Sequence, residues 1–223
     1  MARLATSSDI AFATATLVPV PLLVAGAVFG GVWIILAVLS MTALLFTLDH
    51  LSERAAVGPR EGSEFPAAER LSIALALLHF PLLALGTAAL SGATGLSLAG
   101  QLAAFLAFGL YFGHVSNSNA HELIHRSARK PRRLGEAVFT SLLFGHHASA
   151  HPLVHHRHVA TPQDPATAPL GQGFWSYLPR AWLGGFIEGY RAEIALRTRH
   201  GKTATPWQTP YPGYVAGAVL CLC

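Results

Sequence analysis

The chain has 223 residues, of which 52% are hydrophobic and only 12% are charged, and its formal net charge is +4. Soluble domains normally have about twice that charged fraction, so the composition excludes an ordinary soluble protein. The two cysteines stand close together near the C-terminus, which excludes a disulfide framework. We expect an all-α membrane protein with no nucleic-acid partner.

Four stretches in the first half of the chain contain no Asp, Glu, Lys or Arg. Each is about as long as a helix must be to cross the roughly 30 Å hydrocarbon core of a bilayer. The connectors between the first and second stretch and between the third and fourth are also uncharged. We therefore predict a four-span membrane region over residues 10–112, arranged as two hairpins, with spans at residues 10–28, 31–48, 71–90 and 96–112.

The positive charges predict the orientation of these spans. All 15 lysines and arginines lie in the N-terminus, in residues 49–70 or after the fourth span. Two hairpins place all of these segments on one side, which the positive-inside rule identifies as the cytoplasm. We expect a multi-pass protein of the inner membrane. The basic segment 126–133 is interpreted as a topology determinant in contact with anionic lipids, with docking of an acidic electron-donor protein as the alternative.

Residues 113–200 are predicted to form a cytoplasmic, helical metal-binding region. The helical pattern of the fourth span continues beyond residue 112 without a proline, and it carries His121 and His125. Residues four apart leave the same face of a helix, so we expect these two imidazoles to point the same way. His114 lies near the same stripe of that helix.

A second histidine cluster repeats this spacing. His151 and His155 are four residues apart, and His156 is one step further round a helix. We predict that residues 137–156 form this second helix, with an apolar start that lies against the bilayer. Proline is tolerated in the first turn of a helix but disrupts its interior, so Pro152 is expected to mark a kink or a helix start.

The two clusters together can offer five imidazoles to one place. Neutral imidazole is a ligand for zinc, copper, iron and nickel. A catalytic zinc ion takes only three protein ligands, so the surplus favours a site with two metal ions. Isolated histidines, such as His50, are expected to be ordinary polar or packed residues. The candidate ligands are His121, His125, His151, His155 and His156.

Two carboxylates accompany these histidines. Glu122 completes the pattern H-E-x-x-H, which on its own is the zinc-protease signature with the glutamate as general base. That alternative leaves the second cluster unexplained, so we interpret Glu122 as an outer carboxylate that balances charge near two metals. Asp164 either orients a ligating histidine through its ring N–H or caps a helix that begins at Pro165.

The chain resembles the integral-membrane alkane 1-monooxygenases, within the larger membrane fatty-acid desaturase and hydroxylase superfamily. The first histidine pair falls on the family's first box, the second cluster on its second box, and residues 159–166 on the signature VATPxDPA. Ala150 and Val154 replace a glutamate and a glycine of the family's pattern, and His147 and His158 are additional. The matching segments are HELIHR (121–126), HPLVHHRHVATPQDPATAPLG (151–171) and FWSYLPR (174–180).

The resemblance implies an oxidoreductase with two non-haem iron ions, and Glu122 and Asp164 are the candidate catalytic residues. Members of this family use O2 and two electrons, typically delivered by rubredoxin, to hydroxylate the terminal carbon of an alkane. An acyl desaturase of the same superfamily would share the irons but act on a fatty-acyl chain. It is the alternative interpretation.

Two further elements are predicted in the C-terminal part. Residues 173–200 are expected to form an interfacial amphipathic helix with tryptophans at the lipid headgroups. Residues 211–223 resemble the first half of a fifth span. The family has a third histidine box further along, so the resemblance implies that residues 1–223 are a single domain in an incomplete, inactive form.

Overall fold

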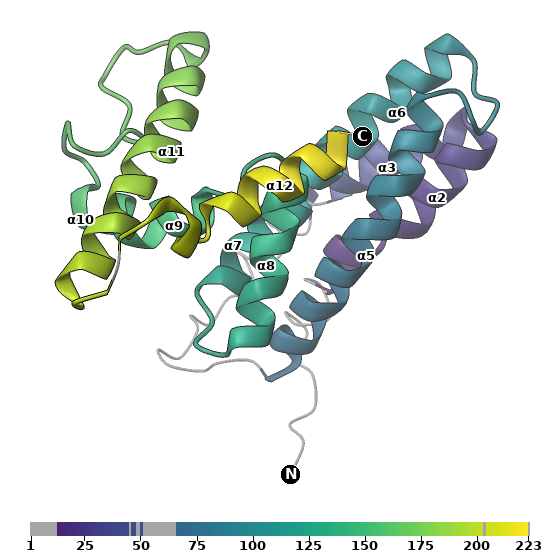
Figure 1. Ribbon diagram of the computed structural model, residues 1–223. Helices are drawn as coiled ribbons and strands as arrows, with labels where there is room; N and C mark the ends of the chain where they lie inside the picture. Colours follow the sequence, from purple (N-terminus) through teal and green to yellow (C-terminus); the bar gives the residue numbers. More distant parts are fainter. Residues whose placement is uncertain (1–12, 45, 48–49, 51–65, 203, 223) are drawn as a thin grey trace. The chain divides into compact units, whose positions relative to one another are not determined.

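The computed structural model describes residues 13–44, 46–47, 50, 66–202 and 204–222, and the regular secondary structure in that part is helical (Figure 1). The predicted all-α class is confirmed for these residues. The start of the first predicted span, most of the predicted loop 49–70 and Cys223 lie outside them. The chain divides into two compact units, Met1–Leu123 and Ile124–Cys223, with the boundary inside helix α7.

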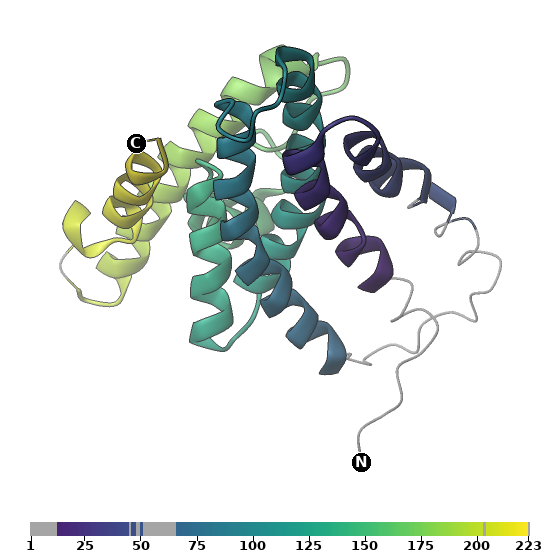
Figure 2. The same cartoon turned by 90° about the vertical axis from the view of Figure 1, so that its right-hand side faces the viewer.

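The first unit begins with a helical hairpin. Helices α2 (Pro19–Phe29) and α3 (Val32–Leu39) pack against each other and are followed by a π-helical turn, η1 (Ser40–Leu44) (Figure 2). The turn between α2 and α3 uses Gly30 and Gly31, whose φ angles of 64° and 54° lie in the left-handed region that glycine adopts without steric cost. The hairpin stands where the first two spans are predicted.

A second pair of helices forms the rest of the membrane-like unit. Helix α5 (Pro66–Leu90) packs against α6 (Leu98–Tyr111). At their contact, a Cβ on Gly86 would lie 3.0 Å from the ring of Phe108, so a small residue lets the two backbones approach. The hydroxyl of Ser97 accepts a hydrogen bond from the N–H of Gly100 at 3.3 Å and caps α6.

Two helices of the described part are long and apolar enough to cross a membrane: Glu69–Leu90, with mean hydropathy 2.1, and Leu98–Ile124, with 1.4. They stand at the predicted third and fourth spans. The apolar helices at the first two predicted spans, Ala13–Phe29 and Val32–Ala43, are shorter. Leu102, Phe105 and Leu106 on α6 are 59–62% exposed, and such large outward-facing side chains fit a lipid environment better than water.

The fourth predicted span continues beyond its apolar part, as expected. Helix α6 leads through a π-helical turn, η2 (Phe112–Ser116), into α7 (Asn117–Ile124). Two buried or partly buried polar contacts tie this helix to α5. The Nδ1 atom of His79 lies 2.9 Å from the Ser116 hydroxyl, and the Asn119 amide donates to the Ser72 carbonyl at 2.9 Å. Because α5 fixes the start of α7 in this way, the position of His121 is set within this unit.

The second unit begins with α8 (Arg129–Ser141), and the predicted single helix over residues 137–156 is wrong. Helix α8 ends at Ser141, and the next helix, α9 (His147–Ala150), begins after a short non-helical segment. Leu143 has a φ of 60°, its N–H bonds to the Thr140 carbonyl at 3.0 Å, and the next N–H, of Phe144, bonds to the Phe139 carbonyl at 2.8 Å. This is a Schellman cap, in which leucine holds the left-handed position that usually belongs to glycine.

Short helical pieces follow the break. A π-helical turn, η3 (His151–His155), leads into α10 (His156–His158). Pro152 stands in the first positions of η3, in agreement with the predicted helix start or kink. The His156 N–H reaches back to the His151 carbonyl, which widens the turn relative to an α-helix.

Three elements complete the second unit: α11 (Phe174–Arg199), the 3₁₀ turn η4 (Pro206–Gln208) and α12 (Tyr211–Leu222). Helix α11 packs along α9 and η3, and α12 packs along α8. The long helix predicted over residues 173–200 is confirmed as a helix. Helix α12 begins where the fifth span is predicted.

Candidate metal centre

The imidazole of His151 is the centre of the histidine cluster in the second unit. It is only 8% exposed, and four other imidazole rings have their centroids within 5.1 Å of its own. The Nε2 atoms of His151 and His156 are 2.8 Å apart. Unless a proton lies between them, two ring lone pairs face each other, which is an arrangement that a bound cation stabilises. The four neighbours of His151 are His125, His147, His155 and His156.

The first histidine pair is positioned by helix geometry. Helix α7 ends at Ile124, and His125 follows in the next turn, one helical repeat after His121. A candidate ligand nitrogen of His121 lies within 4.8 Å of one on His125, and the same holds between His125 and His151. The ring of His125 also stacks on that of His156, with 5.0 Å to His151 and 5.1 Å to His156 between centroids. The ends of α7 and η3 therefore bring imidazoles from both sequence boxes together.

His155 is oriented by Asp164. The Oδ2 atom of Asp164 lies 2.8 Å from Nδ1 of His155, and the Asp164 side chain is only 1% exposed. A carboxylate partner keeps the proton on Nδ1, so Nε2 carries the lone pair that a metal needs. Burial by itself raises the pKa of Asp164, but hydrogen bonds from Thr167, the Ala166 N–H and His155 outweigh it and hold that pKa below its ordinary value. The carboxylate is therefore ionised at neutral pH.

The alternative role for Asp164, capping a helix that begins at Pro165, is wrong. No residue from 165 to 173, all of which the structure describes, is helical. The Oδ1 atom of Asp164 instead accepts a hydrogen bond from the Ala166 N–H at 3.0 Å and closes a short turn. The Asp-Pro pair that favours a helix N-terminus also favours such a turn.

Glu122 is exposed on α7. Successive helical residues are about 100° apart around the axis, so Glu122 leaves a different face of the helix from His121 and His125. Its role near a metal stays a prediction.

Two neighbouring histidines differ from the predicted ligands. His146 is 3% exposed and packs edge-on against the rings of Trp182 and Phe186 on α11. Burial lowers its pKa to about 4, despite a hydrogen bond to the Trp182 backbone, so the ring is neutral and serves packing. His147, with its ring centroid 4.9 Å from that of His151, is a site neighbour that the sequence interpretation did not include among the ligands. Its four-residue spacing from His151 was the available signal.

The donor set fits non-haem iron. Imidazole rings from the turn after α7, from η3 and from α10 converge on His151, one of them with its tautomer set by a buried carboxylate, and no described cysteine lies among them. Neutral imidazole suits iron and also zinc and copper, so the donor set restricts the metal without naming it. His125 of the first histidine box thereby meets the second box.

Comparisons with known proteins agree with the donor set. Residues 95–222 match the family model described as fatty acid desaturase. The chain is 29% identical over 197 residues to alkane 1-monooxygenase 2 of Pseudomonas aeruginosa, which covers 85% of this chain and 52% of the relative. It is 33% identical over 102 residues to alkane 1-monooxygenase 1 of Alcanivorax borkumensis, covering 44% of this chain and 25% of the relative.

Another relative is the xylene/toluene monooxygenase hydroxylase component of Pseudomonas putida, 28% identical over 103 residues, which cover 45% of this chain and 27% of the relative. The chain spans about half the length of the Pseudomonas aeruginosa relative, 52%. The family match begins before α6 and includes both histidine clusters and Asp164. Because it extends over more than half of the residues, the chain belongs to the fatty acid desaturase family, as its histidine boxes predicted.

Proposed function

We propose that the chain is a membrane non-haem di-iron monooxygenase that hydroxylates the terminal carbon of alkanes or similar hydrocarbon chains. It would use O2 and electrons from a rubredoxin-like carrier. The observation that carries this proposal is the convergence of imidazoles on His151 from the end of α7 and from η3 and α10. Relatives named alkane 1-monooxygenase favour hydroxylation over desaturation.

Five histidines would hold the metal: His121, His125, His151, His155 and His156. Bound iron would supply the redox chemistry that, with two electrons from the carrier, activates O2 for hydroxylation of an unactivated C–H bond. The chain's own residues set the conditions for that chemistry. Asp164 keeps His155 in the tautomer that presents Nε2, and the burial of His151 limits the access of water. Glu122 would offset part of the positive charge of the metals.

The membrane would supply the substrate. We propose four spans as two hairpins, with the histidines on the cytoplasmic side of the inner membrane, α11 at the headgroups and α12 as the start of a fifth span. The helix Leu98–Ile124 supports this arrangement, because it is long enough to cross a bilayer and carries His121 in its last turns. A hydrocarbon that descends between apolar helices would reach the metals end first. Position would then select the terminal carbon.

Metal analysis tests the proposal. The chain is purified in detergent, loaded with ferrous iron and assayed for iron and zinc per chain, together with His156→Ala and the control His200→Ala, an exposed histidine at the end of α11. We expect iron binding that His156→Ala lowers and His200→Ala leaves unchanged. Zinc near one per chain that is retained in His156→Ala would overturn the proposal and favour the H-E-x-x-H protease alternative.

Product analysis separates the remaining alternatives. With a reductant, a rubredoxin and an alkane such as octane, a form of the protein that also carries the third histidine box implied by the resemblance is expected to yield a primary alcohol. An alkene formed from a fatty-acyl substrate, with no alcohol from the alkane, would instead identify a desaturase and overturn the hydroxylase assignment.

A further inference from the structure

In the loop after the second histidine cluster, residues 159–173, the Thr167 hydroxyl group forms hydrogen bonds with two separate positions. The Thr167 hydroxyl accepts a hydrogen bond from the Ala160 N–H at 2.9 Å and donates one to Oδ2 of Asp164 at 2.6 Å. Ala160 has a φ of 65°, a left-handed conformation that is strained for a non-glycine residue, so this hydrogen bond helps to hold a strained position. Thr167 therefore joins the two arms of the loop and orients the carboxylate that contacts His155.

Side chains of helix α11 donate hydrogen bonds to the same loop. Nη2 of Arg180 donates to the Thr167 carbonyl at 2.9 Å and to Oε1 of Gln172 at 2.8 Å. One turn earlier on α11, the Tyr177 hydroxyl donates to the Ala166 carbonyl at 3.2 Å. The guanidinium carbon of Arg180 also lies 5.7 Å from the centre of the Tyr177 ring. These contacts fix the backbone on the C-terminal side of Asp164.

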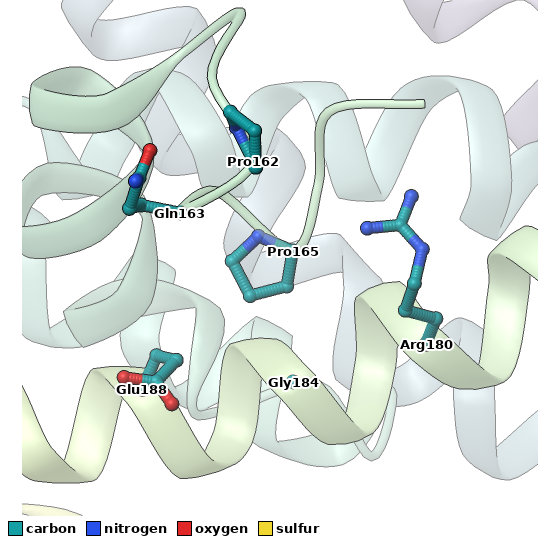
Figure 3. A pocket seen from close by; sticks show the side chains of 6 residues that line it. All are labelled: Pro162, Gln163, Pro165, Arg180, Gly184 and Glu188. Carbon is teal, nitrogen blue, oxygen red and sulfur yellow. The ribbon is translucent and has the colours of Figure 1, made fainter. Parts of the chain in front are cut away.

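A close contact fixes the loop directly after Asp164. Figure 3 shows Pro165 facing Gly184 of α11, with Arg180 reaching towards the loop, in a cleft of about 440 Å³. A Cβ atom on Gly184 would lie 2.7 Å from Cβ of Pro165, closer than real side chains approach. At the next residue, Gly185, the nearest atom to an added Cβ belongs to His146, at 3.7 Å, which is ordinary contact. Glycine at position 184 therefore lets the loop lie this close to the helix.

We propose that Arg180 and Gly184 are positioning residues for the metal ligand His155. They determine where the loop lies, the loop determines where the Asp164 carboxylate lies, and Asp164 sets the orientation of the His155 ring. This inference rests on the proposed function, because it takes His155 as a ligand. Metal sites need their ligands within about 0.5 Å of the productive geometry, so a small displacement of the loop changes the site.

The test uses the two adjacent glycines as a matched pair. The purified chain is titrated with Co²⁺ in detergent, and its visible absorption spectrum reports both affinity and coordination geometry. Gly184→Ala should push on Pro165, whereas Gly185→Ala makes the same change of helix propensity without that push. Replacing an outer-shell partner typically weakens binding about 10–100-fold, so for this more distant contact we expect about threefold to tenfold and an altered spectrum. Gly185→Ala should match the wild type.

Arg180 provides an independent variant. Arg180→Gln should weaken Co²⁺ binding in the same range as Gly184→Ala, and Arg180→Lys, which retains one cationic donor, should restore part of the loss. Thermal unfolding of the metal-free variants shows whether each is folded. If Gly184→Ala does not fold, the comparison of Arg180→Gln with Arg180→Lys decides by the same criterion.

His155→Ala separates this inference from the proposed function. If the wild type binds neither Co²⁺ nor Fe²⁺, or if His155→Ala binds as the wild type does, the proposed metal site itself fails. If His155→Ala loses affinity while Gly184→Ala and Arg180→Gln keep the wild-type affinity and spectrum, the positioning roles are overturned and the metal site stands.

Discussion

The two histidine boxes are built by different means. His121 lies on helix α7, whose start is tied to α5, and His125 follows in the turn directly after that helix. The second box lies on short pieces, the π-helical turn η3 and the three-residue helix α10, after the helix is interrupted at Leu143. Its geometry depends on a loop and on α11. A regular helix fixes side-chain directions locally, whereas a broken one needs contacts from distant segments. The second box should therefore respond to substitutions far from it in the sequence.

The largest expected effect is at His151, because its ring neighbours imidazoles of both boxes. His151→Ala should weaken Co²⁺ binding by more than the roughly 10–100-fold that an outer-shell partner contributes. Equilibrium titration followed by absorption measures the change. His158→Ala, which removes an exposed imidazole of α10, is the control. Equal affinities in the two variants would show that the boxes do not meet at His151.

Asp164 should come next. Asp164→Ala removes the acceptor of the His155 Nδ1–H and two further hydrogen bonds within the loop, so we expect about 10–100-fold weaker metal binding. Asp164→Asn retains an acceptor oxygen and should lose less. The comparison requires both variants to be folded, which circular dichroism checks. Unchanged affinity in Asp164→Ala would mean that the second box holds its geometry without the loop.

A smaller effect is expected at the chain break. Leu143 holds a left-handed position, so Leu143→Gly relieves backbone strain, whereas Leu142→Gly, at an ordinary φ of −87°, only adds backbone freedom. We expect Leu143→Gly to be the more stable of the two by about 1 kcal/mol, from the typical cost of a left-handed residue. Denaturant unfolding in detergent measures the difference. If Leu142→Gly were the more stable variant, the cap at Leu143 would not be the reason that helix α8 ends there.

The smallest expected effect is on the exposed part of α11. Arg191 contacts Glu188 at 2.6 Å, but the Arg191 side chain is 69% exposed, and surface pairs of this kind contribute about 0.2–1 kcal/mol. Arg191→Ala should therefore change stability by less than about 1 kcal/mol and leave Co²⁺ binding unchanged. A loss of affinity equal to that of Arg180→Gln would mean that α11 acts on the site through its charge as a whole, and the specific contacts to the loop would lose their significance.

Much of the candidate site could be predicted because it follows from local geometry. The four-residue spacing of His121 and His125 defines one face of a helix, and the structure continues that helix from the fourth predicted span. Apolar length predicted the helices Glu69–Leu90 and Leu98–Ile124 in the same way. The order of the histidine boxes and of the residues after them was enough to identify the family.

Tertiary structure decided the rest. The local sequence does not distinguish Leu143 from a leucine inside a helix. The left-handed position at a helix end usually carries glycine, and at Leu143 it is held by the hydrogen bonds of the cap. The sequence around Asp164 likewise permits either a helix cap or a turn. In the structure Asp164 contacts His155, and the turn that follows it is held against α11 at Arg180 and Gly184. Spacing along the sequence sets the direction of a side chain within one helix. Which partner that side chain meets depends on how separate segments pack.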